Sequence, residues 1–311
     1  MKLAFVFPGQ GSQTVGMLDS FAENDSVREA LAVADSALSE NLSGLIHEGP
    51  AEDLNLTVNT QPALLTASVA MYNAWLAMGG VRPEVMAGHS LGEYSALTAA
   101  GVFSLHDAVQ LVRFRAKVMQ EAVPVGVGGM AAIIGLSDDA VFDVCRQASE
   151  FGVVEAVNFN SPGQVVIAGE KDAVQKACEI AKASGAKRGL MLPVSAPFHS
   201  SMMKPASVAL ASRLEEVPMQ APTIDVVANI DVSIHHTPQE IRTALAQQAA
   251  GAVQWVKTIE YFKSIGVTHI VECGPGRVLA GLIKRIDLTI QVRNINSAES
   301  LQAVYDELKS F

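Results

Sequence analysis

The chain has 311 residues, of which 49% are hydrophobic, 17% charged and only 5% aromatic. This length and composition suit a large aliphatic core, as in a buried parallel sheet covered by helices. The formal net charge of −10 argues against a nucleic-acid partner. No apolar run approaches the roughly 20 residues of a membrane span. The widely spaced Cys145, Cys178 and Cys273 indicate core residues in a reducing cytoplasm and no metal site.

The N-terminal part of the chain alternates short apolar runs with longer helical patterns. The first apolar run ends at Pro8 without a cleavage pattern, so it is interpreted as a strand rather than a signal peptide. Pro near the start of one helical run and Gly just after its end are typical of a buried helix. Strands are expected at 3–7 and 85–87, and helices at 26–39, 62–78, 93–100 and 104–121.

The helix expected at 104–121 has two distinct faces. Its apolar side chains recur at helical spacing and form one stripe: Leu105, Ala108, Val109, Val112, Ala116 and Met119. Arg115 lies beside this stripe, whereas Arg113 lies further round the helix. We therefore expect Arg115 to point inward and Arg113 to face solvent.

A second unit is predicted at residues 123–195, where the order of elements changes. Strands are expected at 131–136, 153–159, 164–168 and 187–192, with helices at 138–149 (capped by Ser137) and 172–184. The order β-α-β-β-α-β is that of a ferredoxin-like small domain. The chain then resumes its alternation, with strands at 225–228 and 268–272 and a helix from Pro238. This predicts an α/β-hydrolase-like catalytic domain, residues 1–122 and 196–311, with a mainly parallel sheet covered on both faces.

The strongest chemical motif is Gly-His-Ser-Leu-Gly at residues 88–92, between a strand and a helix. A G-x-S-x-G turn in that context lifts the serine hydroxyl above the sheet, at the positive end of a helix dipole. The alternative is a structural glycine-rich turn. The motif therefore makes Ser90 a candidate nucleophile, which requires a general base.

Seven histidines could supply that base. Polar surroundings favour solvated or capping roles for His47, His106, His235 and His236, and His269 begins a strand. His89, beside the nucleophile, is expected to point away from it. His199, in an irregular loop after the small domain, remains the candidate, although a single loop histidine is often incidental. The order nucleophile then histidine is also that of α/β-hydrolases.

Several segments together resemble the malonyl-CoA:acyl carrier protein transacylases, over essentially the whole chain. They are residues 5–13 (FVFPGQGSQ), 60–64 (TQPAL), 88–94 (GHSLGEY), 113–115 (RFR), 160–169 (NSPGQVVIAG), 193–200 (PVSAPFHS) and 272–276 (ECGPG). The resemblance implies transfer of a malonyl group from malonyl-CoA to the phosphopantetheine thiol of acyl carrier protein, for fatty-acid synthesis. It implies a ping-pong cycle through an ester on Ser90, with His199 as base.

The resemblance also assigns roles around Ser90. The backbone N–H groups of Gln10 and Leu91 would form the oxyanion hole, and Arg115 would hold the malonyl carboxylate as a bidentate pair. Four residues would line the substrate cavity: Gln61, Asn160, His89 and Phe198. A turn or capping role is the alternative for Gln61 and Asn160, and a surface ion pair for Arg115. Phe directly before the histidine matches malonyl-selective members.

In this family a backbone carbonyl, rather than a carboxylate, orients the histidine. The match to Val253-Gln-Trp255 places that carbonyl at Gln248, although the stretch from 248 to 253 lacks the Leu and Pro usual there. A neutral partner stabilises an imidazolium less than a carboxylate does, so we expect His199 to stay neutral near neutral pH.

Partners and rival functions follow from the same residues. We expect a cytoplasmic monomer. We also expect no cofactor or metal, because thioester exchange is near thermoneutral. The carriers of this family are acidic, so docking needs a local basic patch. The candidates are Lys187, Arg188, Arg277, Lys284 and Arg285, and the alternative for each is an ordinary solvated surface charge. A serine thioesterase or other hydrolase, a non-catalytic acyl-binding subunit, and an acyltransferase for another acyl-CoA in polyketide synthesis remain as alternatives.

Overall fold

A five-stranded parallel sheet forms the centre of the larger part of the molecule. The computed structural model describes residues 1–194 and 196–310. The strand order is β7-β2-β1-β8-β9, and every neighbouring pair is parallel. The strands are β1 (Leu3–Phe7), β2 (Val85–Gly88), β7 (Asp225–Val227), β8 (His269–Cys273) and β9 (Gln291–Ile295).

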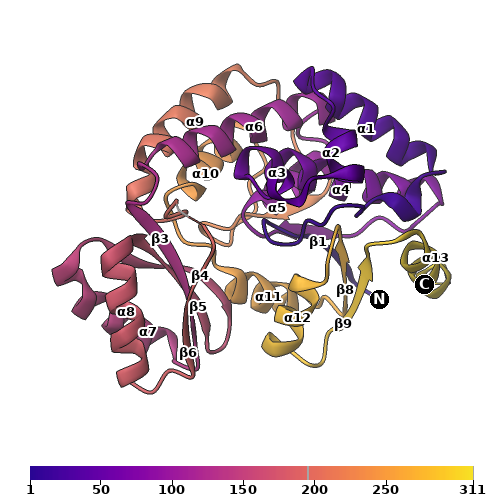
Figure 1. The fold of residues 1–311 in the computed structure, drawn as a ribbon. Coiled ribbons are helices and arrows are strands. Elements are labelled where there is room, and N and C mark those ends of the chain that lie inside the picture. Colours follow the sequence, from indigo (N-terminus) through magenta and orange to yellow (C-terminus); the bar gives the residue numbers. More distant parts are fainter. Residues whose placement is uncertain (195, 311) are drawn as a thin grey trace.

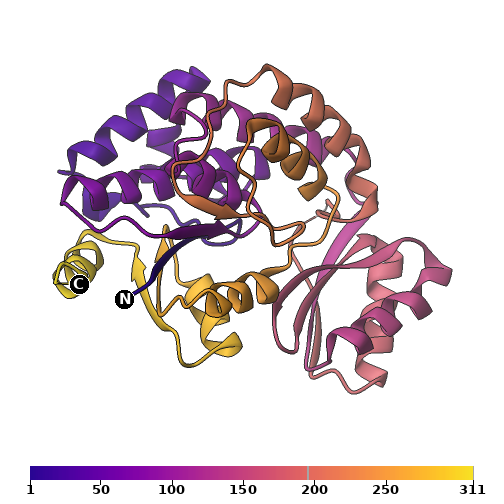
Figure 2. The same ribbon diagram turned by 180° about the vertical axis from the view of Figure 1, so that it is seen from behind.

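Helices cover both faces of this sheet (Figure 1). Alternate residues of β1 explain why: Phe5 and Phe7 pack into one core cluster, and Ala4 and Val6 into the other. The first cluster contains α1 (Asp25–Leu38), α2 (Leu42–Glu48), α3 (Ala51–Leu54), α4 (Thr57–Ala77), α5 (Leu91–Ala99), α6 (Leu105–Glu121), α9 (Lys204–Glu216), α10 (Pro238–Gln248) and α13 (Ala298–Leu308). The second contains α11 (Trp255–Ser264) and α12 (Val278–Ile286). Figure 2 shows both chain ends on the side away from the smaller part.

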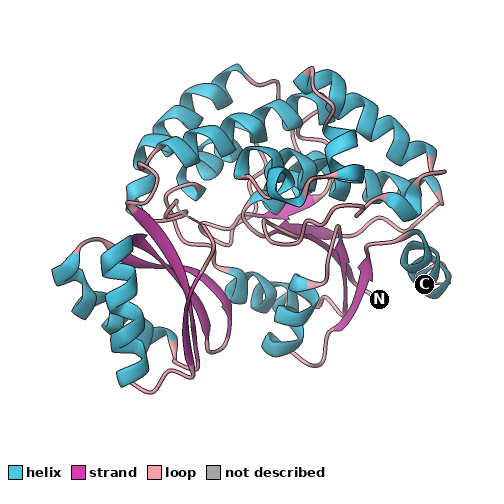
Figure 3. Ribbon diagram, viewed as in Figure 1, coloured by secondary structure: helices cyan, strands magenta, loops and turns pink. Residues whose placement is uncertain are grey.

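The smaller part is built on a separate antiparallel sheet of order β4-β5-β3-β6. Its elements follow the chain as β3 (Gly128–Ile134), α7 (Asp138–Ala148), β4 (Val154–Ser161), β5 (Gln164–Glu170), α8 (Lys171–Ala183) and β6 (Arg188–Met191). Ser137 caps α7 by accepting the N–H of Ala140, as predicted. Figure 3 shows both helices on one side of this sheet. The predicted domain ends at residues 195 and 311 lie outside the described residues.

The two faces of the antiparallel sheet have different neighbours. Ile133 and Ile167 pack with α7 and α8. On the other face, Met130 and Val166 pack with Phe198, on the segment that returns to the larger part. This second face therefore turns toward the segment that carries His199.

The predicted strands and helices are all present, with ends shifted by a few residues. Seven α-helices and β-strands were not predicted: α2 and α3 before residue 60, and α9, α11, α12, β9 and α13 after residue 200. Among the described residues, no helix is both long and apolar enough to cross a membrane. All three cysteines are free and buried, as expected of core residues.

Candidate active site

The turn between β2 and α5 carries Ser90 in an unusual backbone conformation. Its φ is 54° and its ψ is −110°, a sparsely populated region that costs about 1–3 kcal/mol. The flanking glycines make the turn possible, because a Cβ on Gly88 would lie 1.8 Å from the carbonyl oxygen of Gly92. A Cβ on Gly92 would lie 2.1 Å from the carbonyl oxygen of Phe7. The serine thus stands at the carboxyl ends of β1 and β2, where parallel sheets bind ligands.

His199 lies within hydrogen-bond distance of Ser90. The Ser90 Oγ–His199 Nε2 distance is 2.8 Å, and His199 Nδ1 lies 2.8 Å from the backbone carbonyl oxygen of Gln248. A carbonyl only accepts hydrogen bonds, so Nδ1 carries the proton and Nε2 presents its lone pair to the serine hydroxyl. The structure therefore brings together Ser90, His199 and the Gln248 carbonyl in the predicted order.

The surroundings of His199 disfavour its protonation. The side chain is buried, and this desolvation lowers the pKa of His199 to about 3, with a further lowering from the positive charge of Arg115. The imidazole is therefore neutral at physiological pH, which is the state a general base requires.

Arg115 reaches the same place from α6. It is only 1% exposed, whereas Arg113 pairs with Glu40 near the surface, as the helix pattern predicted. Arg115 Nη1 donates to Gln61 Oε1 at 2.8 Å, and Nη2 donates to Ser90 Oγ at 3.1 Å. Burial lowers the pKa of the guanidinium, but an arginine remains charged at neutral pH. The serine hydroxyl therefore faces a buried cation.

A cavity of about 140 Å³ opens in front of Ser90. Its lining residues come from both parts of the molecule: Gln10, Gln61, His89, Ser90, Leu91, Arg115, Met119, Met130, Asn158, Leu192, Val194, Phe198 and His199. Leu91 is the first residue of α5, so its N–H has no partner within the helix. The predicted oxyanion donors Gln10 and Leu91 are thus both at the cavity wall.

His89 and Asn160 form one contact beside the cavity. The His89 Nε2–Asn160 Oδ1 distance is 2.7 Å. His89 lies on the cavity wall, whereas Asn160 stands behind it; Asn158, on the same strand, lines the cavity instead. Burial lowers the pKa of His89. Asn160 therefore contacts the site through His89, rather than through the cavity surface.

Known proteins resemble the chain over nearly its full length. The acyl transferase domain family matches residues 4–286. The malonyl CoA-acyl carrier protein transacylase of Escherichia coli K12 is 54% identical, with 98% of this chain and 99% of that protein covered. The protein of the same name from Bacillus subtilis is 41% identical, with 99% and 98% covered. The chain belongs to this transacylase family.

Solved structures of the family share the fold. The acyl-carrier-protein S-malonyltransferase of Burkholderia pseudomallei superimposes with a TM-score of 0.97 at 58% identity, covering 98% of this chain and all of that one. A malonyl-transacylase in complex with its type II PKS acyl-carrier protein also gives 0.97, at 47% identity, with 99% and 100% covered. The chain is therefore an acyltransferase with the mixed α/β architecture of these enzymes.

Two buried polar residues near Ser90, namely Asn229 and Glu93, were given no role in the sequence analysis. Asn229 Oδ1 accepts the backbone N–H of Ser90 at 2.7 Å, and Glu93 Oε2 accepts the backbone N–H of Asn229 at 3.1 Å. Burial raises the pKa of Glu93 to about 7. A carboxylate inside an apolar helix, three residues after Ser90, was an available signal for Glu93. Asn229 follows the end of β7, next to β2 in the sheet.

The site offers no cluster of acidic or soft ligands. Among residues 1–194 and 196–310, no group of three or more His, Cys, Asp or Glu side chains could hold a metal ion. The groups around Ser90 are instead a neutral imidazole, a cation, amides and backbone N–H donors. Such a set suits nucleophilic acyl chemistry.

Proposed function

We propose that this chain transfers a malonyl group from malonyl-CoA to the phosphopantetheine thiol of an acyl carrier protein, for fatty-acid synthesis. The observation that carries the proposal is the chain of hydrogen-bond contacts from Ser90 through His199 to the Gln248 carbonyl, beside the buried Arg115. A hydrolase needs only the nucleophile and base, whereas the buried cation adds a site for a carboxylated acyl group. The names and near-complete overlap of the relatives point the same way.

In the first half-reaction, Ser90 Oγ gives its proton to His199 Nε2 and attacks the thioester carbon. The resulting oxyanion accepts the N–H groups of Gln10 and Leu91, each worth roughly 3–4 kcal/mol in such a transition state. The C–S bond then breaks, and CoA leaves as a thiol after taking the proton back from His199. The second half-reaction reverses these steps, with the carrier thiol as nucleophile and Ser90 Oγ as leaving group.

Arg115 provides the selectivity in this scheme. Its Nη2 atom donates to Ser90 Oγ in the free enzyme, so the guanidinium edge already faces the atom that receives the acyl group. A malonyl carboxylate would take up a bidentate pair there. An acetyl group would leave the buried charge without that partner, which can cost about 10⁴-fold in specificity.

The second half-reaction requires a carrier to dock. Lys187, Arg188 and Arg285 line one groove of about 1040 Å³ between the two parts, together with Asp138 and Asp139. This groove is much larger than the cavity at Ser90 and holds three of the five predicted basic residues. We assign it to the acidic carrier protein, whose long arm would carry its thiol to Ser90.

The finer description of the fold belongs to the same proposal. The element order β3-α7-β4-β5-α8-β6 and the strand order β4-β5-β3-β6 support a ferredoxin-like domain inserted at residues 123–195. The elbow at the end of β2 supports an α/β-hydrolase-like core of residues 1–122 and 196–311. The enzyme would act as a cytoplasmic monomer. It would need no cofactor or metal, because one thioester is exchanged for another.

Intact-protein mass spectrometry after brief exposure to malonyl-CoA or acetyl-CoA tests the proposal. We expect a malonyl adduct that exceeds the acetyl adduct, is absent in Ser90→Ala and disappears when a phosphopantetheinylated carrier is added. An adduct lost to water as fast as to carrier would indicate a hydrolase instead. Absence of any adduct in the wild type would indicate a binding subunit.

A further inference from the structure

The side chain of Gln248 has a separate task from its backbone. Its Oε1 accepts Arg115 Nη2 at 2.9 Å. Its Nε2 donates to the backbone carbonyl of Ser90 at 3.0 Å and to Glu93 Oε2 at 2.8 Å. Because the two ends of the amide differ in chemistry, this bonding pattern fixes which end faces Arg115. One residue therefore touches the base, the cation and the backbone of the nucleophile.

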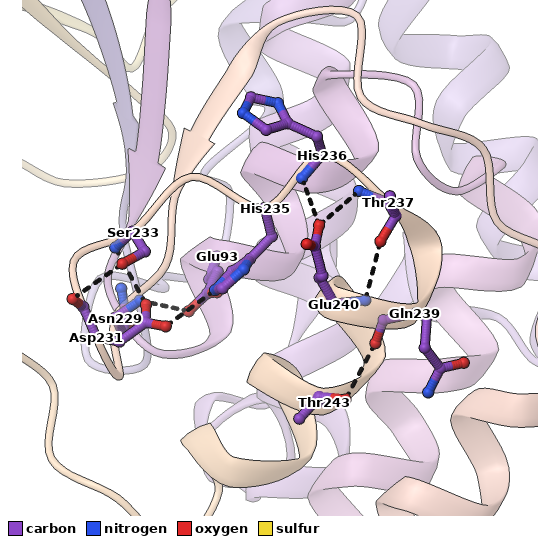
Figure 4. Close-up of polar contacts among 10 residues, drawn as sticks. All are labelled: Glu93, Asn229, Asp231, Ser233, His235, His236, Thr237, Gln239, Glu240 and Thr243. Carbon is purple, nitrogen blue, oxygen red and sulfur yellow. Dashed lines mark hydrogen bonds and ion pairs between the residues drawn. The ribbon is translucent and has the colours of Figure 1, made fainter.

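Glu93 holds this side-chain amide and also the backbone of Asn229. Its Oε2 atom accepts from Gln248 Nε2 and from the backbone N–H of Asn229, whose side chain accepts the N–H of Ser90 and donates to the carbonyl of Gly88. Figure 4 shows the contact between Asn229, in the loop after β7, and Glu93 on α5. A single buried oxygen thus holds the Gln248 side chain, which donates to the Ser90 carbonyl, and the backbone of Asn229, whose side chain accepts the Ser90 N–H.

We propose that Glu93 is a positioning residue, which fixes Ser90 and Arg115 through the side chain of Gln248 and the backbone of Asn229. The inference rests on the proposed function, because it concerns the same nucleophile and the same cation. Glu93 is only 2% exposed, and it is absent from the cavity lining, so it acts through its neighbours. The charged groups that face it are Arg115 and Asp231.

Loss of the anchor has a specific consequence for selectivity. Without Glu93 Oε2, the Gln248 amide loses one of the acceptors that hold its Nε2 atom and keeps the Ser90 carbonyl. Its Oε1 atom is then held less firmly against Arg115 Nη2, while Gln61 still holds the other guanidinium nitrogen. Recognition of the malonyl carboxylate should therefore suffer more than attack on an acetyl thioester.

The experiment compares initial rates of Ser90 ester formation from malonyl-CoA and acetyl-CoA. In Glu93→Ala we expect the malonyl rate to fall about 100-fold, as for a misplaced reacting group, and the malonyl-to-acetyl ratio to fall about tenfold. In Glu93→Gln both rates should stay within about threefold of wild type, because an amide oxygen can replace Oε2. The ratio is the readout that a purely structural role would not move.

Glu272→Ala is the matched control. Glu272 is a second fully buried carboxylate, which accepts the backbone N–H groups of Leu279 and Ala280 and lies outside the cavity. Its loss should lower stability and leave the malonyl-to-acetyl ratio at the wild-type value. Should Glu93→Ala be insoluble, Gln248→Met breaks the same link while keeping the backbone carbonyl, and should give the same tenfold fall.

The outcomes separate the two proposals. A wild-type protein without a Ser90-dependent adduct would overturn the proposed function. A normal wild-type adduct, with an unchanged ratio in Glu93→Ala or Gln248→Met, would overturn the positioning role alone. Glu93→Gln rates as low as those of Glu93→Ala would also overturn it, because the acceptor oxygen would then be insufficient.

Discussion

His199 combines a neutral hydrogen-bond partner with a cationic neighbour. Burial and Arg115 together bring the pKa of His199 to about 3. A base with a lowered pKa is deprotonated above that value and loses activity only as the pH falls toward it. We therefore expect Ser90 acylation by malonyl-CoA to be constant from about pH 5 to 8, as measured by quenched-flow mass spectrometry.

Glu93 provides the control for this measurement, because burial raises its pKa to about 7. Its oxygen can accept hydrogen bonds in both protonation states, so it should impose no acid limb of its own. An acid limb with a midpoint near 6.5 that persists in Glu93→Gln would belong to His199. That result would contradict the neutral-base interpretation.

At the level of single residues, the sequence pattern predicts those groups whose signal is local. Ser90 is marked by its glycines, and Arg115 by its place beside an apolar stripe. The anchoring role of Asn229 depends on a contact with a serine 139 positions earlier, which only the assembled sheet creates. Gln248 is similar. The contact of its backbone carbonyl with His199 was expected, but the hydrogen bonds of its side chain to Arg115 and Glu93 were not.

The elbow between β2 and α5 depends on close packing of backbone, which predicts the effect of adding one methyl group. In Gly92→Ala the new Cβ would meet the Phe7 carbonyl oxygen at 2.1 Å, so β1 and α5 must separate. We expect a loss of about 1–3 kcal/mol in unfolding free energy and a large loss of Ser90 acylation. Chemical denaturation and adduct formation measure the two effects.

A glycine in another helix supplies the comparison. Gly281 lies within α12, and a Cβ there would meet nothing within 4 Å. Gly281→Ala should therefore raise the unfolding free energy by up to ~1 kcal/mol, since alanine favours helix more than glycine does. Equal destabilisation by the two substitutions would contradict the backbone contact as the cause.

The elements differ in how visible they are in the sequence. α12 has a clear buried stripe, Leu279, Ala280, Leu282 and Ile283, so the sequence held enough signal for this helix although the sequence analysis did not predict it. β9 has the sequence Gln-Val-Arg-Asn-Ile, and its three polar residues are more typical of a loop than of a strand. Its place at the sheet edge, beside β8, makes it a strand. Tertiary pairing thus decided what local pattern left open.

At the scale of the whole molecule, the proposed carrier is expected to be acidic, as this chain is. The net charge is −10, so the proposal makes approach of a carrier depend on the local groove lined by Lys187, Arg188 and Arg285. Lys187→Glu or Arg188→Glu should slow transfer from malonyl-Ser90 to the carrier about tenfold more than acylation by malonyl-CoA, most strongly at low salt. Single-turnover kinetics of the two half-reactions measure this difference.

Arg146→Glu is the matched charge reversal. Arg146 is exposed on α7 in the same part of the molecule, pairs with Asp143, and does not line the groove. Its reversal should affect the two half-reactions alike. If Lys187→Glu and Arg146→Glu gave the same result, net charge alone would explain the effect, and the groove would not be the docking site.

The group that orients His199 is a backbone carbonyl, and this has a genetic consequence. In a carboxylate triad, one codon change can erase the orienting acid. Here every one of the twenty residue types at position 248 still presents a carbonyl, so no missense change there deletes the acceptor by itself. Only a change in the path of the chain at the end of α10 would remove it. The orientation of the base is therefore encoded in the helix terminus, while the side chain at 248 is left to serve its neighbours.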